Sequence, residues 1–127
     1  MTLTDDSMSI AQVAEATGLS THALRYYERA GLMLEPVNRA SSTHRRYSAA
    51  DVNWVTFLTK LRSTGMPIAT VKEYTDLVRK GEHSTADRLE LLLRHRIAVL
   101  AQLAEITRSL EAIDNKIALY KERATHA

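Results

Sequence analysis

One short stretch of the sequence carries side chains that suit both the phosphate oxygens and the base edges of DNA. They recur at i, i+3, i+4 and i+7, which is the spacing of one face of a helix. They are His22, Arg25, Tyr26 and Arg29. This stripe holds two guanidinium groups, a phenol and an imidazole, and no carboxylate. Arginine donates in bidentate fashion to phosphates and to guanine, so the stripe predicts contact with nucleic acid.

Two short helices are needed to position that stripe. The first is predicted from Ser9 as N-cap to Ala16, and Thr17-Gly18 breaks its pattern. Ser20 can cap the second helix, and Gly31 occupies the place of a left-handed stop. Two helices joined by a glycine-containing turn are typical of a helix-turn-helix, whose second helix enters the major groove. The alternative, a surface helix pair with solvated arginines, is disfavoured by the segments that flank it.

A basic segment follows the second helix. Residues 37–47 contain Asn, Ser-Ser and Thr, which favour a turn, and then a short basic run that favours a strand. We expect a wing against the DNA backbone that projects His44, Arg45, Arg46 and Tyr47. Composition alone leaves a solvated basic loop as the alternative.

Charge and composition narrow the class of protein. The net charge is +2 and the pI is about 9.0, but residues 20–62 hold seven Lys and Arg against three acids. From residue 81 onward, seven basic residues balance seven acidic ones. The positive excess thus accompanies the predicted DNA-reading region. No apolar run approaches a membrane span and the N-terminus does not resemble a signal peptide, so we expect a cytoplasmic protein with no membrane partner.

Two more helices complete the N-terminal domain, which we predict to span residues 1–80. Ser48 and Asp51 form a capping-box-like start to a helix that runs to about Thr64. The apolar face of this helix is predicted to contain Trp54, Phe57, Leu58 and Leu61, widened by Val52 and Val55. After Gly65 and a tight connection, a fourth helix from about Ala69 to Lys80 presents Val71, Tyr74 and Val78.

The remainder of the chain predicts one long helix. Residues 84–123 contain neither glycine nor proline, and apolar side chains recur there at alternating steps of four and three. The predicted dimerisation residues are Leu92, Val99, Leu103, Ile106, Leu110, Ile113, Ile117 and Tyr120. Arg96 also falls on this seam, and an antiparallel pair would keep the two Arg96 guanidinium groups apart. The predicted fold is therefore mainly α: a winged helix-turn-helix head followed by a coiled-coil dimerisation helix.

On these motifs the chain resembles the MerR family of transcription regulators. The resemblance rests on Ser9-Ile10-Ala11-Gln12-Val13-Ala14, Thr17-Gly18-Leu19-Ser20, Leu24-Arg25-Tyr26-Tyr27-Glu28, Gly31-Leu32, Arg46-Tyr47-Ser48 and Asp51. It extends over essentially the whole chain. Asp51-Val52-Asn53-Trp54, Thr64-Gly65-Met66-Pro67 and the run from Lys72 to Gly81 are most similar to the short members that respond to aldehyde or thiol stress.

The resemblance implies a homodimer that is joined by an antiparallel coiled coil and binds an inverted repeat in double-stranded promoter DNA. It also implies that the bound DNA is distorted so that RNA polymerase engages both promoter elements. Thr21, His22 and Arg25 would reach the major groove, and the wing would grip phosphates. The full expected set is Ser20, Thr21, His22, Arg25, Tyr26, Arg29, Arg45, Arg46 and Tyr47.

The chain departs from the family pattern in three places. Ala23 replaces a common threonine, and Thr43-His44 replace the usual Gly-Tyr of the wing. Lys60, or a neighbour, aligns with the cysteine of the stress-responsive members. The chain has no cysteine at all, which excludes thiolate metal sites and capture of an aldehyde by a thiol. An effector would then be an uncharged or aromatic small molecule or a carbonyl captured by an amine such as Lys60; having no effector is the third option.

Other functions find less support. The five histidines are scattered without metal-ligand spacing, and no phosphate loop or nucleophile motif is present, so we expect neither an enzyme nor a cofactor. The main alternative is an architectural, excisionase-like winged helix that bends DNA; a pure coiled-coil adaptor is disfavoured by the basic wing. Trp54, Phe57 and Tyr74 are candidates to line an effector pocket, with ordinary core packing as the alternative.

Overall fold

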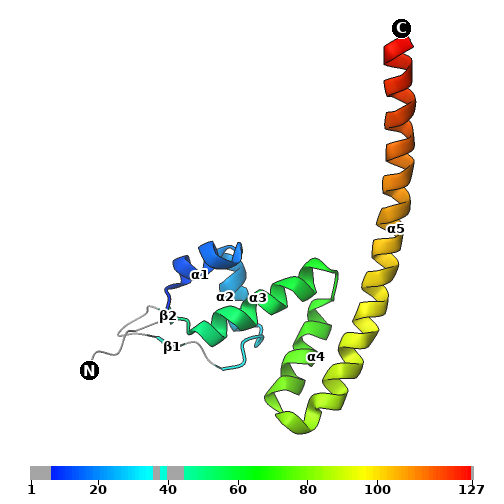
Figure 1. The fold of residues 1–127 in the computed structure, drawn as a ribbon. Coiled ribbons are helices and arrows are strands. Elements are labelled where there is room, and N and C mark those ends of the chain that lie inside the picture. The colour runs from blue at the N-terminus through cyan, green and yellow to red at the C-terminus, as the bar shows by residue number, and fades with distance from the viewer. Residues whose placement is uncertain (1–6, 36–37, 40–44, 127) are drawn as a thin grey trace. The chain divides into compact units, whose positions relative to one another are not determined.

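The computed structural model describes residues 7–35, 38–39 and 45–126. Its elements, in chain order, are α1 (Ile10–Thr17), α2 (Thr21–Arg29), β1 (Asn38–Arg39), β2 (Arg45–Arg46), α3 (Ala49–Ser63), α4 (Ile68–Arg79), the short 3-10 helix η1 (Glu82–Ser84) and α5 (Thr85–His126), as Figure 1 shows. The chain divides into two compact units, Met1–Leu89 and Glu90–Ala127, and each is described by itself. The architecture is the expected one: a mainly helical head with a small two-stranded wing, then one long helix.

Side-chain caps define the first two helices. Ser9 and Gln12 form a reciprocal capping box at the start of α1, where the Ser9 hydroxyl accepts from the Gln12 amide at 3.2 Å. The Ser20 hydroxyl accepts from the Ala23 amide at 3.0 Å and so caps α2. Gly18 ends α1 at φ 77° and Gly31 follows α2 at φ 74°, both in the left-handed region that favours glycine. The predicted helix-turn-helix is confirmed, caps included.

The core of the head lies where α1, α2 and α3 meet, and α4 packs beside α3. Leu24 and Tyr27 fill it from α2. The predicted apolar face of α3 is confirmed in part, because Val55, Leu58 and Leu61 are buried while Trp54 and Phe57 are only half-buried. The physical reason is that α3 contacts α1 as well as α4, which shifts the centre of its buried face away from Trp54.

The wing is a two-stranded antiparallel sheet. Asn38 lies opposite Arg46, and Arg39 lies opposite Arg45. Met8 and Tyr47 form an adjacent isolated bridge with paired backbone hydrogen bonds of 2.7 and 2.8 Å, which joins the wing to the segment before α1. The predicted wing tip, including His44, lies outside the described residues.

A polar network around buried Ser84 closes the connection between α4 and α5. Gly81 has φ 93°, and the Ser84 hydroxyl, which is 2% exposed as a residue, donates to the carbonyls of Leu77 and Gly81. The Arg88 guanidinium donates to the Ser84 hydroxyl at 2.9 Å and to the Gly81 carbonyl at 2.6 Å. Ser84 thereby links Arg88, in the first turn of α5, to Leu77 in the last turn of α4.

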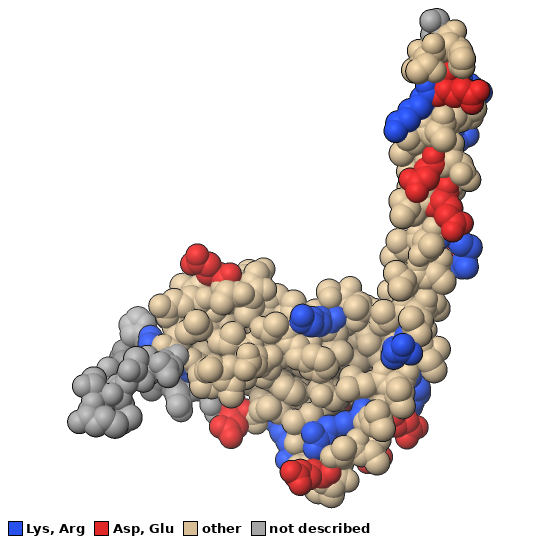
Figure 2. Space-filling view, viewed as in Figure 1, with Lys and Arg blue, Asp and Glu red and all other residues tan. Residues whose placement is uncertain are grey.

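The second unit consists of the remainder of α5. Its side chains at residues 101–126 are all exposed, including six apolar or aromatic residues of the predicted seam. Their exposed fractions lie between 46% and 64%; they are Leu103, Ile106, Leu110, Ile113, Ile117 and Tyr120. Acidic and basic side chains are interspersed along the face of α5 seen in Figure 2. Among the described residues, no helix has the length and apolar character needed to cross a membrane.

Candidate nucleic-acid interface

The structure places the predicted DNA-facing stripe on one exposed face of α2. His22, Arg25 and Arg29 are exposed, and the Tyr26 side chain is exposed by 41%. Thr21, the first residue of the helix, is half-buried. Leu24 and Tyr27 turn to the opposite side and are buried, so the predicted stripe lies on the face of α2 that points away from the core. The exposed face carries donors and cationic groups suited to a major groove.

The single acidic residue of α2 does not join this exposed face. Glu28 is half-buried, and its carboxylate accepts a hydrogen bond from the hydroxyl of Tyr47. A free carboxylate beside Arg25 and Arg29 would repel phosphates and neutralise part of the local positive charge. The contact with Tyr47 therefore holds this carboxylate toward the interior of the head and away from the exposed stripe.

The expected role of Tyr47 in gripping phosphates is corrected by this geometry. Its side chain is 0% exposed, and its backbone amide and carbonyl pair with Met8. A fully buried ring cannot contact DNA in this conformation. Tyr47 instead anchors the end of the wing to Glu28 of α2.

Arg46 has a structural contact that the sequence did not predict. Its Nε donates to the Ser7 hydroxyl at 3.0 Å and its Nη2 donates to the Ser7 carbonyl at 2.9 Å. The half-buried guanidinium thus braces the chain just before α1. Contact of Arg46 with phosphates stays a prediction, and the side chain of Arg45 lies outside what the structure describes.

Tyr27 lies on the buried face of α2 as a neutral side chain. Burial raises the pKa of the Tyr27 phenol above its usual value; the Arg62 guanidinium lowers this pKa and the neighbouring Tyr26 phenol raises it. The rings of Tyr26 and Tyr27 lie 6.3 Å apart between centroids at an interplanar angle of 57°. Tyr27 therefore stays protonated at neutral pH and packs as an uncharged ring beneath the exposed stripe.

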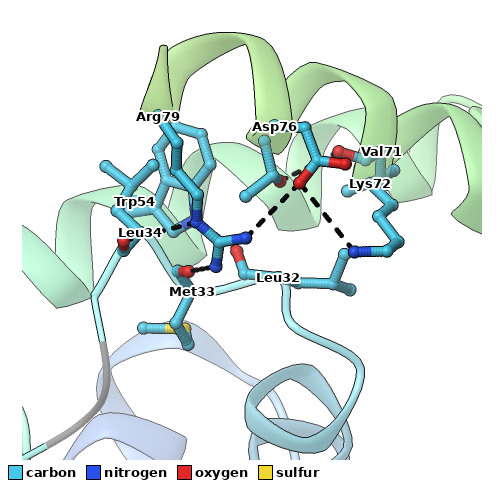
Figure 3. A network of polar contacts seen from close by, with 9 residues as sticks. Leu32, Met33, Leu34, Trp54, Val71, Lys72, Asp76 and Arg79 are labelled. Atoms are coloured by element: carbon cyan, nitrogen blue, oxygen red, sulfur yellow. Dashed lines mark hydrogen bonds and ion pairs between the residues drawn. The ribbon is translucent and has the colours of Figure 1, made fainter. Parts of the chain in front are cut away.

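The segment between α2 and the wing is held in a way that sequence reasoning missed. Figure 3 shows Leu32, Met33 and Leu34 presenting their backbone carbonyls to side chains of α3 and α4. The Trp54 indole N–H donates to the Leu32 carbonyl at 2.7 Å. Arg79 donates through Nη2 to Met33 and through Nε to Leu34, the latter at 3.4 Å. No local sequence pattern signals these bonds, because their partners stand 22 to 46 positions apart.

The three aromatic residues predicted for an effector pocket do come together. The rings of Trp54 and Tyr74 are stacked, with 5.8 Å between their centroids and an interplanar angle of 7°. The rings of Phe57 and Tyr74 are tilted by 56°, also with 5.8 Å between their centroids. They line an open hollow of about 490 Å³ together with Leu34, Ala50 and Asn53. Burial raises the pKa of Tyr74, while the Arg88 guanidinium lowers it. The hollow is mainly apolar, which suits an uncharged ring more than an ion.

The described part of the chain contains no cluster of side chains suited to binding a metal ion. No group of three His, Asp or Glu side chains there has a geometry that could hold an ion.

Taken together, the capped helix pair, the cationic outer face of α2 and the attached wing define a winged helix-turn-helix DNA-binding protein. Two family models match the chain: "MerR HTH family regulatory protein" over residues 8–77 and "MerR, DNA binding" over residues 52–124. The chain belongs to the MerR family of helix-turn-helix transcription regulators.

Individual relatives agree with this assignment. The HTH-type transcriptional regulator AdhR of Bacillus subtilis is 40% identical over 89 residues, which make up 70% of this chain and 63% of that protein. An HTH-type transcriptional regulator of Haemophilus influenzae, itself uncharacterized, is 32% identical over 112 residues, or 88% of this chain and 82% of that protein.

A solved structure matches nearly the whole chain. It is the crystal structure of HiNmlR, described as a MerR family regulator lacking the sensor domain and bound to promoter DNA. The TM-score is 0.81 at 31% identity, and the match covers 91% of each chain.

Proposed function

We propose that this transcription regulator works as a homodimer that binds an inverted repeat in promoter DNA, with one head on each half-site. The observation that carries the proposal is the exposed face of α2, on which His22, Arg25, Tyr26 and Arg29 lie with no carboxylate among them. Glu28 would lower the positive charge of this face if it joined it, but its carboxylate accepts a hydrogen bond from the hydroxyl of buried Tyr47. The similarity to HiNmlR, which was crystallised on promoter DNA, supports the same use of the head.

The long helix supports the dimer. Between Leu103 and Tyr120 every residue of the predicted seam is exposed in the single chain, at alternating steps of three and four. Such a continuous apolar stripe is costly in water and pairs well with a second helix of the same pattern. We propose the antiparallel arrangement, because Arg96 then lies away from the Arg96 of the second copy.

Control of transcription would follow from the geometry of two linked heads. Two rigid heads on one DNA duplex fix the distance and twist between their half-sites, and so impose a shape on the DNA between them. We propose that this distortion changes how RNA polymerase engages the promoter. The architectural alternative, bending without regulation, predicts binding at scattered sites that have no relation to promoters.

The aromatic hollow is the place we propose for a small effector. Trp54, Phe57 and Tyr74 offer stacked rings to an uncharged or aromatic molecule, and no cysteine is present for thiol chemistry. Packing of the three rings without any ligand is the alternative. Trp54 is the only tryptophan, so its fluorescence reports directly on the hollow. A panel of aldehydes, quinones and hydrophobic drugs that left both the emission and transcription unchanged would contradict the effector site.

The central experiment selects DNA duplexes from a random library with the wild-type protein and then footprints the winning sequence. We expect one inverted repeat, protection of two half-sites, and a change in transcription in vitro when RNA polymerase is added. Equal affinity for the selected duplex and for random duplex would contradict the proposed function.

A further inference from the structure

The chain that leads from the recognition helix to the wing is fixed through its backbone carbonyls. Three successive carbonyls, those of Leu32, Met33 and Leu34, accept hydrogen bonds from only two side chains, Trp54 and Arg79 (Figure 3). These two come from different helices, α3 and α4. We call residues 32–34 the connector. Side chains of α3 and α4 thus hold the connector through hydrogen bonds to its backbone, in addition to packing against its side chains.

The connector is also tied directly to α2. The Leu32 amide donates to the Tyr27 carbonyl at 2.9 Å, at the end of the helix that carries the DNA-facing stripe. The side chains of Leu32 and Met33 are buried. One peptide unit therefore bonds to α2 through its N–H and the next bonds to Trp54 of α3 through its carbonyl oxygen. Because β1 begins at Asn38, only a few residues after the connector, fixing the connector also restricts the position of the first strand of the wing.

Arginine is well suited to this place and lysine is not. The guanidinium presents several N–H groups in a fixed plane, so it can reach two successive carbonyls and a carboxylate at once. Arg79 does so: it donates to Met33 and Leu34, and its Nη1 lies 3.4 Å from the Asp76 carboxylate. Lys72 reaches the same carboxylate at 3.8 Å. The side chain of Arg79 is still 36% exposed, so a variant can be made there without opening the core.

We propose that Arg79 is a positioning residue for DNA recognition, which acts by holding the connector so that α2 and the wing keep one fixed spacing. The inference rests on the proposed function, because it assumes that α2 and the wing both bind DNA. Arg79 itself is expected to touch neither a base nor a phosphate. Its substitution should therefore weaken binding to the selected operator while leaving weak, sequence-independent binding in place.

The test compares Arg79→Ala and Arg79→Lys with wild type in the full chain. The matched control is Lys80→Ala, which removes the same charge one residue later; Lys80 is exposed and none of the described contacts of the connector involves it. Three quantities are measured for each protein: affinity for the operator selected by wild type, affinity for random duplex, and the midpoint of unfolding in urea. The slope of log affinity against log salt is measured for both duplexes.

We expect Arg79→Ala to lose on the order of tenfold in operator affinity under conditions where the variant is fully folded, with affinity for random duplex and the salt slope close to wild type. Arg79→Lys should restore little, because an ammonium cannot bind both carbonyls. Lys80→Ala should behave as wild type for the operator.

Other outcomes overturn the inference in distinguishable ways. A salt slope that falls by about one unit, with both affinities lowered, would make Arg79 a direct phosphate contact. A fall in affinity that only follows a lowered unfolding midpoint would make its role one of stability. Unchanged operator affinity in Arg79→Ala would remove any role. If wild type itself selects no duplex, the proposed function fails and not the positioning role.

A second substitution tests whether the connector is one unit. Trp54→Phe removes the indole N–H that binds Leu32 while keeping an aromatic ring. Since both side chains hold adjacent carbonyls, the double variant with Arg79→Ala should lose less operator affinity than the two single losses combined. Strict additivity would show that the two contacts act separately and would contradict a shared positioning role.

Discussion

The hydroxyl of Tyr47, which directly follows β2, donates a hydrogen bond to the carboxylate of Glu28 in α2. This contact joins the wing to the recognition helix across 19 positions of sequence. The exposed face of α2 carries Arg25 and Arg29, whereas the only carboxylate of the helix is half-buried and hydrogen-bonded within the head. We therefore expect both the stability of the head and its affinity for DNA to depend on this bond.

Loss of that bond should be visible in stability. Tyr47→Phe leaves a half-buried carboxylate without its hydroxyl donor, and we expect unfolding to become easier by about 1–3 kcal/mol. Urea denaturation followed by circular dichroism measures this change. Tyr26→Phe is the matched control, since its hydroxyl is on the exposed side of the same helix and its loss should change stability little. Equal effects of the two substitutions would contradict the role assigned to Tyr47.

Arg25 should contribute to sequence discrimination. It stands in the middle of the exposed stripe of α2, where a guanidinium can bind a base edge. We expect Arg25→Ala to cost about 1–3 kcal/mol of operator affinity and to relax the preference at one base pair. Competition binding against single-base variants of the operator measures both effects. Arg94→Ala, which removes an equal charge from α5, should leave the preference intact; a uniform loss for all duplexes in Arg25→Ala would mean that it binds only phosphate.

Arg46 should act on affinity without regard to sequence. We expect Arg46→Ala to weaken binding to every duplex and to reduce the salt slope by about one unit, as the loss of one phosphate contact does. Titrations at several salt concentrations measure the slope. Because Arg46 also braces Ser7, an unchanged slope together with a lower unfolding midpoint would assign it to that brace alone.

The predicted seam of α5 can be tested at one residue. Leu110→Asp would place a carboxylate in an apolar helix–helix contact, where it finds no partner, and should dissociate or unfold the dimer. Sedimentation equilibrium at micromolar concentration gives the mass of wild type and variant. Glu111→Gln alters the next residue off the seam and should keep the wild-type mass. A wild-type protein that sediments as a monomer would contradict dimerisation itself.

The buried tyrosines predict how stability depends on alkaline pH. Burial raises the pKa of both Tyr27 and Tyr74 above the usual 10.0, so the folded head keeps their protons when the unfolded chain begins to lose them. The contribution of these two groups to the free energy of unfolding is therefore fully present below pH 10.0 and declines as pH rises above it. Urea midpoints measured between neutral and strongly alkaline pH should show this decline. It should be shallower in Tyr74→Phe, and an unchanged slope in that variant would contradict the prediction for Tyr74.

Local chemistry made the helices and their ends predictable, because caps and stop glycines act within a few residues. Ser20, Ser48 and Gly31 each perform the role that their type and position suggest. The exposed stripe of α2 was equally predictable from the sequence, because the period of the helix separates it from Leu24 and Tyr27. Even the closeness of Trp54 to Tyr74 follows from two adjacent helices with facing aromatic residues.

Tertiary contacts decided what the sequence could not predict. Tyr47 belongs by composition to a basic, exposed wing, yet its ring is buried because the strand ends against Met8 and α2. Arg79 fits the basic last turn of a helix, and only the fold shows that it reaches back to Met33 and Leu34. Backbone carbonyls exist at every position, so a sequence cannot show which of them a distant arginine will bind.

The exposed apolar stripe of α5 has a consequence for how the amount of protein sets the response. If two chains must pair before either reads a full operator, the concentration of active regulator rises with the square of the chain concentration while pairing is incomplete. Occupancy of the promoter then changes more steeply with expression than it would for a single-headed protein. The hydrophobic surface of one helix would in this way turn the rate of synthesis of the chain into a threshold for its target genes.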